Sequence, residues 1–331
     1  MHRYIFKRIL MLIPVMLGVL IVVFFISRYM RGDPARQLAG DNASAEDVAQ
    51  LRTELGLDKP LPVQFGNYVY RLVTKFNLGI SYQSKRDVGT EVAARFPTTM
   101  LLAFLSVLLA LIIGIPFGII SAEKQYTVLD HVGLVISLAG VSMPNFWQGL
   151  INILIFSIYL GWLPATGFYT WKHWVLPALT VGTSSAALIM RTTRSSMLEV
   201  IHQDYIRTAR AKGLSEQVVV IRHALKNALI PIITVVGIQF GGLLGGAVLT
   251  ESIFAIPGLG KYMVDAIKAR DYPVIQGGVL ILALIFSVVN LIVDIIYAYV
   301  DPRIKSTYSS RRKKKKAPGA PAVSHFAEGG R

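Results

Sequence analysis

The stretch that most resembles a chemical site is a glycine-containing segment that ends in Gly260-Lys261. A phosphate-binding loop needs a glycine at its first position and a serine or threonine after the lysine to hold magnesium. Ala255 and Tyr262 occupy those two positions here. The sequence therefore predicts that this chain binds no nucleotide or other cofactor itself.

The residues that metal sites and serine hydrolases usually need are also missing from the expected arrangement. There is no Cys, and the six His residues lie far apart, without the spacing of metal ligands. An intramembrane serine hydrolase needs a histidine base, and no histidine falls within an expected span. The weak resemblance of Gly182-Thr-Ser184-Ser to a membrane-protease motif therefore does not indicate a catalytic site. We expect no catalytic residue, no metal site and no enzyme activity.

The composition is that of a chain that uses lipid as its solvent. Hydrophobic residues make up 53% of the sequence and charged residues 16%, and the mean hydropathy is +0.52. The net charge of +15 lies largely in short segments beside apolar runs, which indicates membrane orientation and not binding to nucleic acid.

Six apolar runs are long enough to cross a bilayer. The first could be a cleaved signal peptide, but it is too long, and Arg28-Tyr29-Met30-Arg31 follows it in place of a small-residue cleavage site. We therefore predict an all-α integral membrane protein with six transmembrane helices, near residues 9–27, 98–120, 132–159, 175–190, 230–249 and 274–300.

The positive charges predict the orientation of these spans. With the N-terminus inside, the inner segments carry 20 Lys and Arg, and the two short outer loops carry 4. Short loops rich in Lys and Arg stay on the cytoplasmic side. Both termini are therefore expected in the cytoplasm.

Residues 28–97, which we call the cap, are expected to fold on the outer side. Ser44 is a predicted helix N-cap, Asp47 lies in the first turn, and Gly56 follows the expected last residue. Pro60 opens a second amphipathic stretch that runs to Phe76. We expect a small helical cap.

The membrane-spanning part ends near residue 304, and residues 305–331 form a tail of different character. The tail contains a run of basic residues, 311–316, and a Pro- and Gly-rich end. Such a segment is typical of a disordered cytoplasmic arm close to anionic lipid.

The fifth span carries glycines four residues apart, including Gly237, Gly241 and Gly245. Small residues at this spacing allow close helix packing, which is either static or part of a pathway that opens. Gln239 falls on the opposite face and is a candidate polar group lining that pathway.

Two other spans contain polar groups at membrane depth. Pro144 should break the third span and leave free backbone carbonyls beside Asn145 and Gln148. In the sixth span Asn290 and Asp294 lie one turn apart, where Asp294 either pairs with an arginine near the membrane surface or takes part in transport.

The segment between spans four and five, residues 191–229, is the coupling loop. Ser196 and Glu199 match a capping box, and the helix expected after them would carry Ile201, Tyr205 and Ala209 on one stripe that ends at Gly213. We expect a cytoplasmic helical hairpin that docks on a partner, with ordinary loop helices as the alternative.

The coupling loop resembles that of ATP-binding-cassette importer permeases, in particular the peptide and nickel branch. The resemblance rests on Asp204-Tyr-Ile-Arg-Thr-Ala-Arg-Ala-Lys-Gly213 and Arg222-His-Ala-Leu-Lys-Asn-Ala-Leu-Ile-Pro231. The general importer motif has Glu-Ala where Arg207 and Thr208 stand, but this branch carries Tyr-x-Arg-Thr-Ala-Arg-Ala-Lys-Gly. Shorter blocks in conserved order, such as Leu78-Gly-Ile-Ser81 and Arg270-Asp-Tyr-Pro273, extend the resemblance to residue 304.

This resemblance implies a B-type permease subunit in a bacterial inner or plasma membrane. Its implied partners are a second permease, two ATPase subunits that hold ATP and Mg, an extracytoplasmic solute-binding protein and lipid, with no nucleic acid. Di- or oligopeptides are the expected cargo, with nickel, glutathione or oligosaccharide as alternatives, and an ion-coupled carrier is the alternative class. The residues that the resemblance assigns to ATPase coupling are Tyr205, Arg207, Ala209, Arg210 and Gly213.

Overall fold

The computed structural model describes residues 2–29, 33–40 and 42–300. Within them the chain is almost entirely helical, and the strand pairing is limited to one antiparallel bridge between Ile80 and Asp87. The expected all-α class is therefore confirmed. The predicted disordered tail lies outside the described residues.

Five of the described helices are long and apolar enough to cross a membrane. All five contain prolines or glycines, and the fourth in chain order is preceded by a short π-helical segment. They are α1 (His2–Tyr29), α5 (Val88–Glu123), α8 (Lys172–Ile201), α11 (Lys226–Gly246, preceded by α10, Glu216–Val218, and η2, Val219–Leu225) and α14 (Tyr272–Val300).

The expected third span is a bent pair of helices. Its halves, α6 (Val128–Ser142) and α7 (Asn145–Asn152) with η1 (Ile153–Tyr159), meet at 104°. Proline disfavours the helical conformation in the residue before it, and Met143 is accordingly extended, with ψ 122°. The described part of the chain thus has five spans, or six if this pair counts as one.

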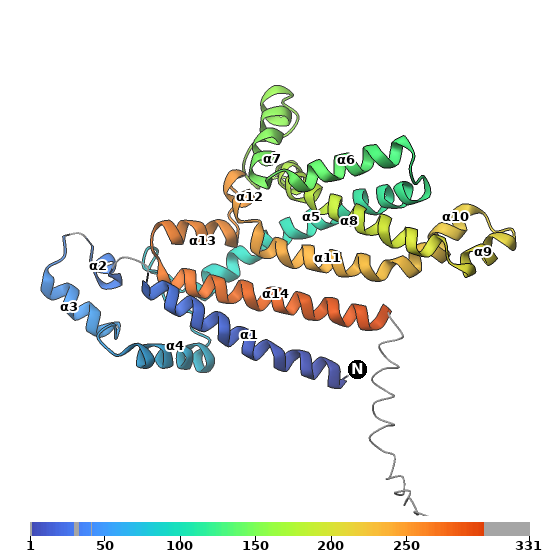
Figure 1. The fold of residues 1–331 in the computed structure, drawn as a ribbon. Coiled ribbons are helices and arrows are strands. Elements are labelled where there is room, and N and C mark those ends of the chain that lie inside the picture. Colours follow the sequence, from blue (N-terminus) through green and yellow to red (C-terminus); the bar gives the residue numbers. More distant parts are fainter. Residues whose placement is uncertain (1, 30–32, 41, 301–331) are drawn as a thin grey trace, which may run out of the picture.

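The spans form a layered bundle in which α5 and α8 make the closest pair. An added Cβ on Gly118 would lie 2.7 Å from the carbonyl oxygen of Met190, and one on Gly182 would lie 2.9 Å from that of Ser106. These glycines let the two backbones touch. Next to this pair, α11, α14 and α1 lie side by side (Figure 1).

The cap gathers at one end of the bundle, shown at the left of Figure 1. Ser44 is the expected N-cap and forms a capping box with Asp47, and Gly56 has φ +65°. Phe65 packs its ring 5.2 Å from that of Phe24 in α1. The cap helices are α2 (Pro34–Ala39), α3 (Ala45–Glu54) and α4 (Leu61–Lys75). The short helices α12 (Val248–Ile253) and α13 (Leu259–Lys268) pack on the spans, α12 beside α7 and α13 on α14 and α5.

The coupling loop lies at the opposite end of the bundle, with α9 (Asp204–Ala211) and α10 at its tip (Figure 1). The start of α1 and the end of α14 reach the same end as the coupling loop. The two ends of the described chain therefore share a side with the coupling loop, as the charge distribution requires.

Candidate functional site

The coupling helix α9 begins later than the sequence pattern indicates. Its N-cap is Gln203, and Ser196, expected to start the helix, is buried inside α8, which continues to Ile201. The predicted capping box is therefore wrong. Met197, the residue after Ser196, is fully buried, so the packing of α8 keeps this helix continuous past the local capping pattern.

The described coupling loop divides its residues between a buried and an exposed face. Ile206 and Ala209 belong to the protein's own apolar core, whereas Tyr205 is 43% exposed and the Arg207 side chain is 73% exposed. Gly213 is exposed and has φ +78°, a conformation that glycine adopts without strain. Ala209 thus holds α9 on the bundle, and Tyr205, Arg207 and Gly213 face outward.

Polar contacts give the hairpin a fixed shape. Arg210 donates from Nε to Glu216 Oε2 at 3.0 Å, which joins α9 to α10. Asn227 Nδ2 donates to the Tyr205 hydroxyl at 2.8 Å, which joins α9 to the start of α11. Contacts within the chain itself therefore fix the shape of the hairpin.

The glycines of α11 fall into two groups, one packed against α14 and one with open space beside it. A Cβ on Gly237 would lie 2.2 Å from Val293 Cγ2, and one on Gly241 would lie 3.1 Å from the Phe286 ring, so both give α14 close access. Gly245 has no atom within 4 Å of such a Cβ. Helix packing within the chain accounts for the first two glycines but not for Gly245.

The polar candidates in the spans are held by α8. Gln239 Nε2 donates to Ser185 Oγ at 3.0 Å, and Gln148 Nε2 donates to the Thr183 hydroxyl. Asn152, which sequence reasoning missed, donates to Thr180 Oγ1 at 2.9 Å. The Thr and Ser run at 180–185 in the fourth span was the sequence signal for this polar face.

The polar pair in the sixth span has structural partners. Arg8 Nη1 lies 2.8 Å from Asp294 Oδ2, which confirms the expected pairing of Asp294 with an arginine. Asn290 Nδ2 donates to the Phe286 carbonyl in its own helix at 2.9 Å. Asp294 therefore joins α14 to α1.

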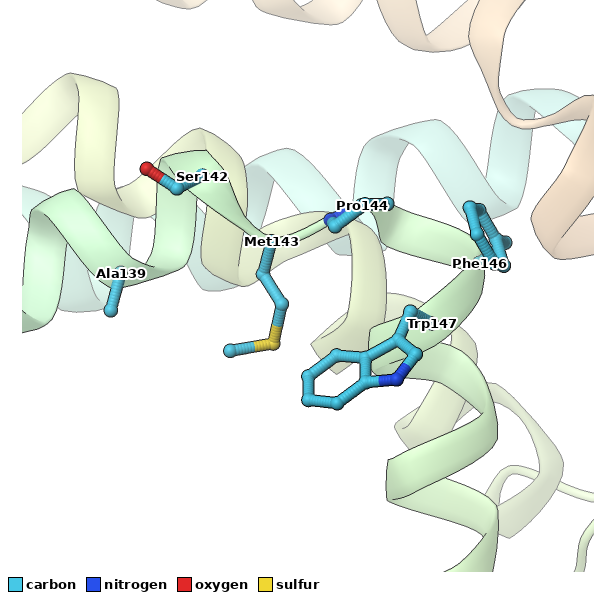
Figure 2. A pocket seen from close by; sticks show the side chains of 6 residues that line it. All are labelled: Ala139, Ser142, Met143, Pro144, Phe146 and Trp147. Atoms are coloured by element: carbon cyan, nitrogen blue, oxygen red, sulfur yellow. The ribbon is translucent and has the colours of Figure 1, made fainter.

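The bend of the third span forms an open apolar groove of about 510 Å³ (Figure 2). Met143 and Trp147 lie across from one another on its two sides, and Asn145 is half-buried at the start of α7. The groove is lined by Ala139, Ser142, Met143, Pro144, Phe146 and Trp147.

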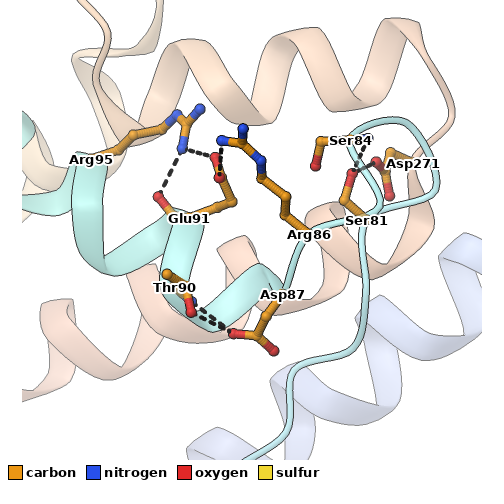
Figure 3. Close-up of polar contacts among 8 residues, drawn as sticks. All are labelled: Ser81, Ser84, Arg86, Asp87, Thr90, Glu91, Arg95 and Asp271. Carbon is orange, nitrogen blue, oxygen red and sulfur yellow. Dashed lines mark hydrogen bonds and ion pairs between the residues drawn. The ribbon is translucent and has the colours of Figure 1, made fainter.

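At the cap end, Asp271 organises the loop that contains Ser81 (Figure 3). Its carboxylate accepts from the Ser81 hydroxyl at 2.5 Å and from the backbone N–H groups of Tyr82 at 3.0 Å and Gln83 at 3.2 Å. Asp271 is 2% exposed. Nearby, Glu91 binds both Arg86 and Arg95.

A second buried carboxylate, Glu251, holds the loop before α13. It accepts from Thr99 Oγ1 at 2.6 Å and from the Lys261 N–H at 2.9 Å. Burial raises the pKa of the Glu251 carboxyl, and these hydrogen bonds offset only part of that effect. Gly258 leaves room for it, because a Cβ there would lie 2.2 Å from Glu251 Cδ.

Among the described residues no group of three or more His, Asp or Glu is placed to hold a metal ion. The arrangement contains an exposed helical hairpin, a bent helix pair and polar contacts packed between helices.

Comparison with known proteins decides the family. Residues 114–306 match the family described as binding-protein-dependent transport system inner membrane component, and residues 1–103 match its N-terminal family. The chain belongs to this family of importer permeases.

Relatives within the family agree along nearly the whole chain. The dipeptide transport system permease protein DppB of Alkalihalophilus pseudofirmus is 46% identical, and the match covers 92% of this chain and 100% of that protein. The glutathione transport system permease protein GsiC of Salmonella choleraesuis is 45% identical, with 92% and 99% covered.

A solved structure shares the fold. An inward-facing form of the MetNI methionine ABC transporter superposes with a TM-score of 0.51 and 19% identity, covering 63% of this chain and 96% of the matched chain. At that identity the likeness concerns the permease fold alone.

Proposed function

We propose that this permease subunit of an ATP-binding-cassette importer carries di- and oligopeptides and forms one half of their pathway. The observation that carries the proposal is the preformed coupling hairpin, with Tyr205, Arg207 and Gly213 outward and Ala209 buried. A carrier that is driven by an ion gradient has no use for such a docking surface.

The partners follow from this assignment. A second permease of the same family completes the pathway, and two ATPase subunits bind ATP and Mg and dock on the coupling loops. A solute-binding protein delivers the peptide at the cap, residues 28–97. Closure of the ATPases shifts the permease pair between two states of access.

The orientation and location belong to the same proposal. We place the chain in the inner or plasma membrane of a bacterium, with both termini in the cytoplasm and the basic residues 305–331 near anionic lipid. The common end shared by the start of α1, the end of α14 and the coupling loop supports this orientation.

Glutathione is the second candidate cargo, because relatives named for glutathione transport are as similar as the dipeptide relative. Glutathione is itself a short peptide, so the two cargoes share chemistry. Competition between unlabelled glutathione and labelled dipeptide for uptake separates them.

The test is reconstitution into liposomes. The full complex should take up labelled dipeptide only with ATP and the binding protein, and this chain alone should take up none under a proton or sodium gradient. Saturable gradient-driven uptake by the chain alone would overturn the assignment.

A further inference from the structure

A buried ion pair joins three elements where the coupling loop begins. Asp130, at the start of α6, is 1% exposed and receives Arg194 Nε at 2.7 Å and Nη2 at 2.8 Å. The same carboxylate accepts from the Ser121 hydroxyl in α5 and from the Tyr126 N–H at 3.0 Å. The carboxylate therefore has a full set of partners.

Such a pair is a costly way to stabilise a fold. Desolvation of two charges consumes most of their attraction, and apolar replacements of a buried pair are often no less stable. A bidentate arginine does, however, fix the direction and distance of two helices. The pair at Asp130 is therefore suited to setting a helix position.

The ion pair sets the position of α6, a helix that contributes no buried residue to the apolar core around the coupling helix α9. The core around Ile206 and Ala209 draws buried residues from α5, α8, α9, η2 and α11, and none from α6. Along α8, α6 packs through small residues: Gly140 would bring a Cβ 3.5 Å from that of Ala187, and Gly133 faces the flexible end of Met190. The ion pair between Asp130 and Arg194 is the contact that fixes the direction of α6 against α8.

We propose that Arg194 and Asp130 are positioning residues that make the first half of the bent third span move with the coupling helix. Arg194 lies two turns before the end of α8, from which the chain enters α9 directly. A displacement of α9 thus passes through α8 and the ion pair to α6. It ends at the Met143-Pro144 bend, where it changes the groove of Figure 2.

This inference rests on the proposed function and is tested in the complete reconstituted complex. The variants are Arg194→Gln, Arg194→Lys and the double Asp130→Asn with Arg194→Met, and Arg191→Gln is the matched control. Arg191 lies one turn earlier on α8 with an exposed side chain. Uptake per ATP hydrolysed and ATPase-subunit retention are measured for each.

We expect Arg194→Gln to lower uptake per ATP about fivefold or more while the ATPases remain bound, since coupling energies of 1–3 kcal/mol correspond to such factors. Arg194→Lys should fall between it and the wild type, and Arg191→Gln should match the wild type. The double variant leaves no buried charge unpaired, so it should assemble yet stay uncoupled. Normal uptake per ATP in the double variant would overturn the proposal.

A distance measurement separates this inference from the proposed function. The chain has no Cys, so spin labels can be placed at Val135, exposed on α6, and at Lys212, after α9. The interlabel distance should stay constant between ATP-free and ATP-trapped wild type and should change between these states in Arg194→Gln. A constant distance in both proteins would refute the role of the pair, whereas loss of ATP-dependent uptake in the wild type would refute the proposed function alone.

Discussion

The two ends of the molecule use buried carboxylates in different ways. At the cap end, Asp271 and Glu251 accept hydrogen bonds from the backbone N–H groups of Tyr82, Gln83 and Lys261. At the coupling-loop end, Asp130 accepts one backbone N–H, that of Tyr126, and also binds the Arg194 side chain, which belongs to another helix. The first arrangement fixes the shape of a loop, and the second fixes one helix relative to another.

This difference teaches which parts of the permease stay rigid. Buried backbone N–H groups that lose a carboxylate acceptor are left unsatisfied, so removing that acceptor is costly. A side-chain pair between helices allows the helices to move together as a unit. We therefore expect cap-end variants to lose stability and coupling-end variants to lose communication.

Asp271→Ala should have the largest effect on stability. It removes the acceptor of three hydrogen bonds in a buried site, and we expect a loss of about 3 kcal/mol in the free energy of unfolding in detergent. Asp265→Ala is the control, because its surface pair with Lys261 contributes about 0 to 1 kcal/mol. An equal loss of unfolding free energy in the two variants would contradict the proposed stabilising role of the buried carboxylate.

Glu251 should make stability at the cap end depend on pH. Its pKa is raised from the model-compound value of 4.5, so the folded protein holds the proton more tightly than the unfolded chain does. This contribution is fully present below pH 4.5 and is lost as the pH rises through the folded pKa. The melting temperature of wild type minus that of Glu251→Gln should therefore fall from pH 4.5 upward, and a difference that rises with pH would contradict the assigned sign.

Gly213→Val should separate communication from folding at the coupling-loop end. With φ +78° at this position, a β-branched residue is strained by about 1 kcal/mol or somewhat more, while no atom lies within 4 Å of an added Cβ. Insertion and binding-protein docking should remain, and substrate-stimulated ATP hydrolysis and uptake should fall together. Ala209→Trp is expected to act differently, by disrupting the core around Ile206.

Arg207→Ala should have the smallest effect. Its side chain is 73% exposed and lies 3.9 Å from Asp204, so the pair contributes about 0 to 1 kcal/mol. ATPase stimulation should stay close to that of wild type. A loss as large as that of Gly213→Val would assign Arg207 a direct contact with the ATPase.

Much of the fold could be predicted from the sequence, because local signals and packing agree there. Ser44, Gly56 and Pro144 act as expected, since a cap, a left-handed turn and a proline break depend on neighbouring residues. Ser196 fails because burial of Met197 overrides a local capping pattern.

Most of the tertiary polar contacts could not be predicted. Asp271 and Ser81 are 190 residues apart in sequence, and Arg194 and Asp130 are 64 apart, so no spacing rule connects them. Asp294 was the exception, because a carboxylate at membrane depth needs a partner and Asp294 lies close enough to the end of its predicted span to reach an arginine. The burial of Ala209 likewise depends on η2 and α11, which no pattern within α9 reveals.

The most direct test of the account is photocrosslinking from the two ends in the complete complex. A photoreactive residue at Tyr205, 43% exposed on the coupling helix, should form an adduct with an ATPase subunit. The same probe at Phe76, 87% exposed at the cap, should form none with an ATPase. An ATPase adduct at Phe76, or its absence at Tyr205 in an intact complex, would contradict the account.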